Sequence, residues 1–215
     1  DITRGAQEAF AIESHRKASA RGAAAPEFVS VCGHRGDPFA RRLTAGLCAR
    51  LPVLAGSSTH GVTAATIAVE ADAAAAVLLV SERALAAIRP PARIVRIEGG
   101  RRAGGDPERP GLAPIEAARA VLRHAGLSVS SVSVAEIMEA FAVQAMVCIA
   151  ALELDPVCVN PGGGALARGH PIGASGAIVA VRAWHELQTM ASGAVGLAAI
   201  AAAGGLGSAA LLRAE

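Results

Sequence analysis

Aromatic side chains are scarce in this chain of 215 residues: they make up 2% of it, and tyrosine is absent. A hydrophobic core must therefore consist of alanine, valine, leucine and isoleucine, and a hydrophobic share of 53% is enough to form one. The abundant alanine and the 24 glycines favour close packing of helices on a sheet. The composition indicates one sizeable domain or two small ones.

A strong excess of charge is also missing. The net charge of +2 is too small to indicate a nucleic-acid partner, and we interpret the bias of the basic residues toward arginine as GC-rich coding. Residues 187–212 carry no charge and could span a bilayer, but glycines and polar residues interrupt them. Two buried strands joined by a glycine turn are therefore favoured over a membrane helix, and we expect no membrane partner.

The four cysteines lack the CxxC spacing that is typical of zinc sites, and they do not form a disulfide framework; they are Cys32, Cys48, Cys148 and Cys158. We expect free, mostly buried thiols, no metal and a cytoplasmic location, since no signal peptide is visible. The chain begins with Asp1, not methionine, which leaves open that it is a fragment or a processed product.

Periodicity and turn residues predict a layered α/β fold. We expect helices over 3–21, 41–51, 112–126, 133–154 and 177–187, and strands over 27–31, 93–98, 156–160, 196–203 and 208–212. Residues 71–81 read as a small-residue helix leading into a buried strand, followed by a short helix to about 88. Pro90 and Pro91 mark a boundary. The order after it, β-α-α-β-α-β-β, predicts a mixed sheet with helices on both sides and an antiparallel final strand.

One histidine stands in a loop built for close contact. Residues 169–176 read Gly-His-Pro-Ile-Gly-Ala-Ser-Gly, and a helical pattern follows directly. Glycine lets backbone approach a ligand, Pro171 fixes φ beside the imidazole of His170, and a helix N-terminus offers free N–H groups. The pattern favours an imidazole held toward an anionic or carbonyl group; a tight loop with an incidental histidine is the alternative.

Four motifs in order resemble the C-terminal half of thiolases, which condense or cleave β-ketoacyl-CoA thioesters. They are Met-Glu-Ala-Phe-Ala at 138–142, Asn160 with the glycines at 162–164, the histidine loop at 169–176, and Gly-Gly-Leu-Gly at 204–207. The resemblance spans nearly the whole chain and about the second half of a full-length thiolase. It implies a layered αβαβα core, with a partial CoA-binding loop domain at 1–54, closing elements of the first core domain at 55–90, and a complete C-terminal core domain at 91–215.

The resemblance also implies roles for individual residues. In the family a cysteine of the first half attacks the acyl-CoA, and the histidine corresponding to His170, after Gly169, activates it. Phe141, beside Ala140, would line the pantetheine tunnel, with core packing as the alternative. Ala68 stands where the family serine meets pantetheine. Arg41 or Arg42 matches a family arginine near the adenine and phosphates, although exposed arginines usually only solvate a surface.

Several family positions have changed. Met138 replaces the asparagine that holds a catalytic water, Ala201 replaces the second cysteine, and Ala203 replaces a glycine near the oxyanion hole. Arg168 replaces an apolar residue before Gly169, where it would either repel a proton from the imidazole or point into solvent. None of the four cysteines lies in the nucleophile motif, so the nucleophile would come from elsewhere.

Two functions remain open at this point. The chain either supplies the histidine of an acyl-CoA acyltransferase whose nucleophile lies on a separate or missing N-terminal half, or it is an inactive acyl-CoA-binding or scaffold subunit. A coenzyme A thioester is the expected substrate and no cofactor is needed. We expect an N-terminal half or further copies of the chain as partners, because the apolar face of half a thiolase would otherwise be exposed to water.

Overall fold

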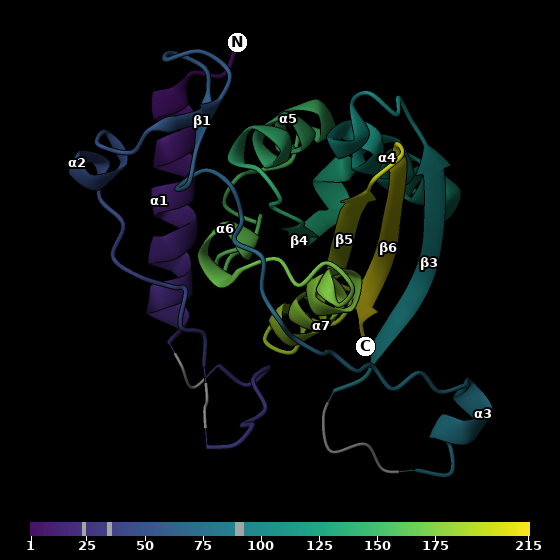
Figure 1. Ribbon diagram of the computed structural model, residues 1–215. Coiled ribbons are helices and arrows are strands. Elements are labelled where there is room, and N and C mark those ends of the chain that lie inside the picture. Colours follow the sequence, from purple (N-terminus) through teal and green to yellow (C-terminus); the bar gives the residue numbers. More distant parts are fainter. Residues whose placement is uncertain (23–24, 34–35, 89–92) are drawn as a thin grey trace.

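The computed structural model describes residues 1–22, 25–33, 36–88 and 93–215. Its centre is a four-stranded sheet of β3 (Val95–Gly104), β6 (Leu206–Ala214), β5 (Val195–Ala202) and β4 (Val132–Ile137), in that spatial order. Strand β6 runs antiparallel to both of its neighbours, whereas β4 and β5 are parallel. The mixed sheet with an antiparallel final strand is thus confirmed (Figure 1).

Helices cover both faces of this sheet (Figure 1). Helices α4 (Ala113–Ala125) and α5 (Ala142–Leu152) pack on one face, where Val195, Leu197 and Ala199 alternate along β5. Helix α7 (Ser175–Leu187) packs on the other face, against Ala198. Because side chains alternate across a strand, β5 must be apolar on both sides, which explains the uninterrupted apolar run in its sequence.

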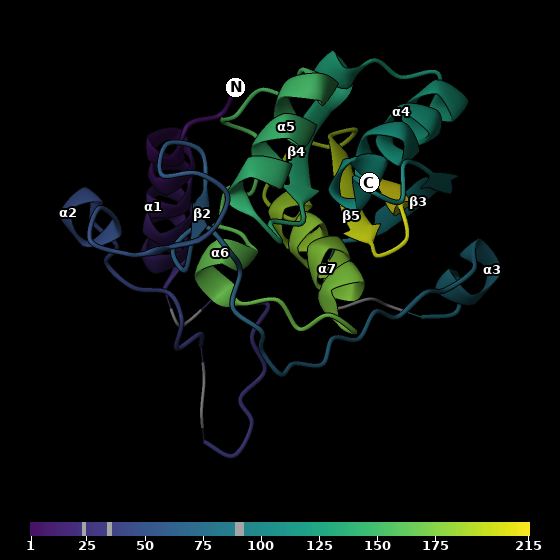
Figure 2. The same ribbon diagram turned by 45° about the horizontal axis from the view of Figure 1, so that its top comes forward.

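A second group of elements lies beside α5. Helix α1 (Arg4–Arg21) begins at Thr3, whose hydroxyl accepts a hydrogen bond from the Ala6 N–H at 3.2 Å. It packs against α5 and against α6 (Ala165–Arg168). Helix α2 (Ala45–Cys48) and the hairpin of β1 (Val53–Ala55) and β2 (Val62–Thr63) lie next to α1 (Figure 2).

The predicted helix over 133–154 is wrong, because this range contains strand β4 and then helix α5. The sequence pattern of Ser133 and Glu136 is that of a capping box. Instead, the Ser133 hydroxyl accepts from the Val195 N–H at 3.2 Å, and the buried Glu136 carboxylate binds Arg182 at 2.8 Å. Because Glu136 is charged but buried, the periodicity of the sequence did not indicate a strand here. The observed order is β-α-β-α-α-α-β-β.

Several other helices and strands have bounds that differ from the predicted ones, and two predicted strands do not form. Residues 27–31 form a turn and an extended segment, not a strand, and 156–160 contribute only a bridge between Ala135 and Val159. Of the helix expected over 41–51 only α2 forms, whereas β3 extends to Gly104, beyond the strand end expected at 98. The helices over 3–21, 112–126 and 177–187, the short helix α3 (Glu82–Leu85) and the two closing strands are confirmed.

Residues 71–81 contradict their prediction most clearly. They form neither helix nor strand, and the apolar residues Val77–Val80 are exposed, with Leu78 at 84%. The segment runs past α7 toward α3 without a sheet to join among the described residues (Figure 2). Pro90 and Pro91 lie outside the described residues, so the domain division stays a prediction. Within the described parts of the chain, no helix is long and apolar enough to cross a membrane.

Candidate active site

His170 is held by the first turn of the helix that follows it. Its Nδ1 lies 2.7 Å from the Ser175 hydroxyl oxygen, and that hydroxyl donates its proton to the Pro171 carbonyl at 2.9 Å. A hydroxyl has one proton, so Nδ1–H must be the donor to Ser175. This tautomer leaves the lone pair of Nε2 free. Burial lowers the pKa of the half-buried His170, which keeps the imidazole neutral and able to accept a proton.

Gly169 allows the histidine loop to pack closely against residues 69–71. Its φ is +88°, and a Cβ there would lie 2.8 Å from the Ala71 Cβ, so a side chain is excluded on two grounds. The backbone N–H of His170 donates to the Val69 carbonyl at 2.7 Å. The loop therefore docks on an extended segment that comes from far upstream in the sequence.

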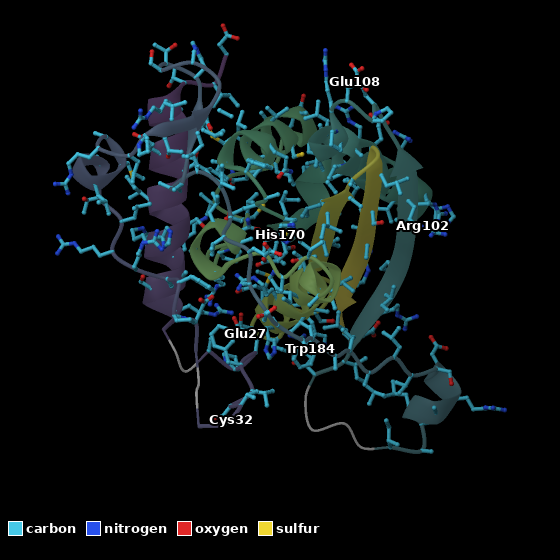
Figure 3. All side chains as sticks on the ribbon, viewed as in Figure 1. Glu27, Cys32, Arg102, Glu108, His170 and Trp184 are labelled. Atoms are coloured by element: carbon cyan, nitrogen blue, oxygen red, sulfur yellow. The ribbon has the colours of Figure 1, made fainter. Side chains whose placement is uncertain are left out.

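That segment, residues 66–71, gathers most of the predicted site. The Ala68 N–H donates to the Ala140 carbonyl at 3.0 Å, and Ile67 forms a bridge with Phe141. Phe141 is 41% exposed, so it is not a core residue. His170, Gly169, Ala68, Ala140 and Phe141 thus lie along one segment, with His170 near the centre of the molecule (Figure 3).

A buried carboxylate to which the sequence patterns assign no role supports this arrangement. Glu139 accepts from the Ser14 hydroxyl at 2.8 Å, from the Leu166 N–H at 3.2 Å and from the Asn160 side-chain amide at 2.6 Å. A Cβ on Gly164 would lie 2.1 Å from the Glu139 carboxyl carbon. Burial raises the pKa of Glu139 above its usual value. The sequence could have indicated this role, because Glu139, Asn160 and the glycines all belong to the thiolase-like motifs.

Of the three changed family positions, Ala201 lies on β5, Met138 hydrogen-bonds to it, and Ala203 follows its end. Met138 is buried, and its N–H donates to the Ala199 carbonyl at 3.0 Å. Ala201 stands opposite Gly207 on β6, and Ala203 is exposed in the turn that follows. A thioether donates no hydrogen bond and a methyl group transfers no proton, so these side chains offer no acid–base chemistry.

Arg41 and Arg42 are exposed, and no contact of either with the 66–71 segment is found among the described residues. The Arg41 guanidinium donates to the Phe39 carbonyl at 3.2 Å, and its backbone N–H donates to Nδ1 of His15 at 3.3 Å. Phe39 connects the two regions, because a Cβ on Gly169 would lie 3.3 Å from its ring.

The Arg168 side chain is only 10% exposed, so the expectation that it points into solvent is wrong. Its Nη2 donates to the Gly162 carbonyl at 2.8 Å, and its guanidinium lies 5.2 Å from the centre of the Phe28 ring. The expected repulsion on His170 is absent as well, since burial alone lowers the pKa of that imidazole.

Within residues 1–22, 25–33, 36–88 and 93–215, no cluster combines three or more histidine, cysteine, aspartate or glutamate side chains that could hold a metal ion. All four cysteines are free thiols, with Cys48 and Cys148 buried and Cys32 exposed.

Comparisons with known proteins agree with this fold. The family model described as "Thiolase, C-terminal domain" matches residues 88–214. The beta-ketothiolase BktB of Cupriavidus necator is 38% identical over 98% of this chain and 56% of its own length. The Acat5 thiolase of Ascaris suum, solved with coenzyme A, superimposes with a TM-score of 0.85 at 33% identity, over 99% of this chain and 56% of its own.

An acetyl-CoA acetyltransferase of Bacillus anthracis gives a TM-score of 0.89 at 30% identity, over 100% of this chain and 57% of its own. The chain therefore spans about half the length of the relatives it matches. The matched region covers the sheet, its helices and the histidine loop, and on this basis the chain belongs to the thiolase family.

Proposed function

We propose that the chain supplies the base of a thiolase-type acyl-CoA acyltransferase, and that a cysteine on an N-terminal half supplies the nucleophile. The observation that carries this proposal is the His170–Ser175 contact of 2.7 Å, which presents an unprotonated Nε2. A neutral, oriented imidazole is what a base for a thiol needs.

The proposed proton path uses His170 twice. Nε2 takes the proton of the cysteine thiol, and the thiolate adds to the thioester carbonyl of the acyl-CoA. The intermediate then expels the CoA thiolate, which receives the proton from Nε2–H. The products are an acyl-cysteine and free CoA, and the imidazole returns to its starting state.

Ala201 limits the second half of this chemistry. Carbon–carbon bond formation requires a base for the proton next to the thioester carbonyl, and an alanine cannot act as one. Transfer of the acyl group to a thiol or to water needs no such proton removal. We therefore favour acyl transfer or thioester hydrolysis over Claisen condensation.

The exposed apolar segment favours a partner half. Residues 70–75, 171–174 and 177 border an open groove of about 520 Å³. Residues Val77–Val80 follow shortly after in the sequence and are exposed. Contiguous exposed apolar surface of this kind typically marks an interface. An N-terminal half that supplied a sheet next to this segment would cover it and bring a cysteine close to the histidine loop.

The test uses the complex that the chain forms in its source cells, purified through a tag on the chain. We expect acetyl-CoA to leave an acetyl group on a partner cysteine, detected by intact mass. In His170→Gln the rate of acetylation of this cysteine should fall by about a hundredfold or more, because a positioned acid–base group contributes that much. The exposed His124→Gln on α4 is the matched control. An acylation rate that His170→Gln leaves unchanged would refute the proposal.

The second candidate is an acyl-CoA-binding subunit without turnover. Met138, Ala201 and Ala203 together favour it, because three family positions with chemical roles have lost them. Calorimetric titration of the same complex with acetyl-CoA separates the two functions. Binding without an acetyl adduct supports the binding subunit, whereas an adduct that depends on His170 supports the transferase.

A further inference from the structure

Two arginines donate to successive carbonyl groups of the glycine loop that precedes the histidine. Arg168 Nη2 lies 2.8 Å from the Gly162 oxygen, and Arg182 Nη2 lies 2.6 Å from the Gly163 oxygen. Arg168 directly precedes Gly169 and His170. Arg182 stands on α7, the helix whose first turn contains Ser175. The two contacts therefore fix the glycine loop to the element that orients the imidazole.

Both arginines also face acids from one upstream stretch, residues 25–33 and 36–39. Arg182 Nη1 lies 3.8 Å from the Glu27 carboxylate, and Arg168 Nη1 lies 3.9 Å from that of Asp37. In Figure 3, Glu27 lies near Trp184 of α7, whereas Cys32 marks the outer end of the same stretch. This stretch thus covers the glycine loop through two ion pairs.

Asp37 connects these ion pairs to Gly169. Its Oδ1 accepts from the Phe39 N–H at 2.9 Å, a local turn that sets the direction of the chain at Phe39. The Phe39 ring then lies 3.3 Å from the position that a Cβ of Gly169 would occupy. One oxygen of Asp37 thus places the ring against the histidine loop, and the other faces Arg168.

Stability does not explain this group of charges. The side chains of Arg182 and Arg168 are only 6% and 10% exposed, and burial lowers the pKa of Arg168 to about 10. Within the described residues, one buried atom of each of three members lacks a hydrogen-bond partner: Glu27 Oε2, Glu136 Oε1 and Arg168 Nε. Buried ion pairs with incomplete hydrogen bonding rarely stabilise a fold more than apolar side chains would, but they can specify one arrangement.

We propose that Arg168 and Arg182 are positioning residues for His170, which clamp the glycine loop between α7 and the stretch that contains Glu27 and Asp37. This role rests on the proposed function, in which His170 is the base. The clamp acts on the distance between the imidazole of His170 and the Ser175 hydroxyl, and so on the hydrogen bond that keeps the proton on Nδ1.

The experiment observes the imidazole directly and needs no acyl transfer, so its outcome is separate from that of the proposed function. Long-range ¹H–¹⁵N spectra report which ring nitrogen carries the proton, and His170→Gln assigns the signal. The rate at which diethyl pyrocarbonate modifies His170, followed by peptide mass, is the second readout. We expect Arg168→Met to give a mixture of tautomers and a several-fold change in that rate, and Arg168→Lys to restore the native values.

Glu98→Gln is the matched control, because it breaks the partly buried ion pair of Glu98 with Arg213, 2.7 Å long, between the paired strands β3 and β6. It should leave both readouts at their native values. If Arg168→Met fails to fold, Asp37→Asn decides, since it removes the charge facing Arg168 and keeps the side-chain shape. Native spectra and native rates in the folded variants, or an equal change in Glu98→Gln, would overturn the proposal.

Discussion

Helices α4 and α7 cover opposite faces of one sheet with different chemistry. The buried side of α4 is apolar and includes Ala118, Val121 and Leu122. The buried side of α7 includes Arg182 and Glu186, which pair with Glu136 and Arg21. Apolar packing alone holds α4 on this sheet. The buried charges of α7 therefore indicate that the position of this helix must be fixed more specifically than apolar packing would fix it. His170 and Ser175 lie on the α7 side.

The largest expected effect tests the charged face. Arg182→Met leaves Glu136 and Glu27 buried without their partner, and we expect the free energy of unfolding to fall by about 3–5 kcal/mol. The measurement is urea unfolding followed by circular dichroism. Adding Glu136→Leu should recover much of the loss, because an apolar pair replaces an unpaired charge. A loss below about 1 kcal/mol for Arg182→Met would show that the two faces do not differ in this way.

The apolar face should respond to volume alone. Leu122→Ala removes a buried side chain of α4, and we expect a loss of about 2–5 kcal/mol from the smaller transfer energy and the cavity. The same urea unfolding measures it. The modification rate of His170 by diethyl pyrocarbonate should stay native, since α4 packs on the far side of the sheet. A changed rate in this variant would mean that the two faces are coupled.

His15 on α1 provides a third case, a titratable group buried without an acidic partner. Burial lowers its pKa to about 4, so the unfolded chain takes up a proton first as the pH falls from about 6.5. Stability should therefore be lost between pH 6.5 and 4, by up to about 3 kcal/mol. The measurement compares unfolding free energies of the native chain and His15→Gln at both pH values. Equal pH slopes in the two proteins would contradict this assignment.

The sequence alone predicted the elements whose signals are local. Caps and periodicity located α1, α4 and α7, and the glycine turn located the closing hairpin. Strand β4 was missed because Glu136 is buried beside Arg182, and periodicity treats a charge as exposed. Residues 77–80 were expected inside because they are apolar, but the described residues contain no sheet for them to join.

The candidate site likewise contains residues that the sequence indicated and residues that only the structure identifies. The resemblance to thiolases implied site roles for His170, Gly169 and Phe141, and the structure brings these residues to the segment 66–71. The roles of Ser175 and Arg168 were not visible, because they depend on how the histidine loop meets α7. An arginine in a sequence is normally an exposed residue, and only three-dimensional contacts identify it as buried.

The smallest expected effect returns to α4, whose side chains also form an ion pair, but at the surface. Glu116 and Arg119 lie 3.0 Å apart, one turn from each other, with both side chains about half exposed. Water screens such a pair, so Glu116→Gln should change the free energy of unfolding by about 0.5 kcal/mol or less. The measurement compares the urea midpoints of the native chain and Glu116→Gln, without salt and with about 0.5 M salt, which screens surface charges. A loss comparable to that of Arg182→Met would mean that charge pairs matter equally on both helices, and the assignment of a positioning role to the α7 side would lose its basis.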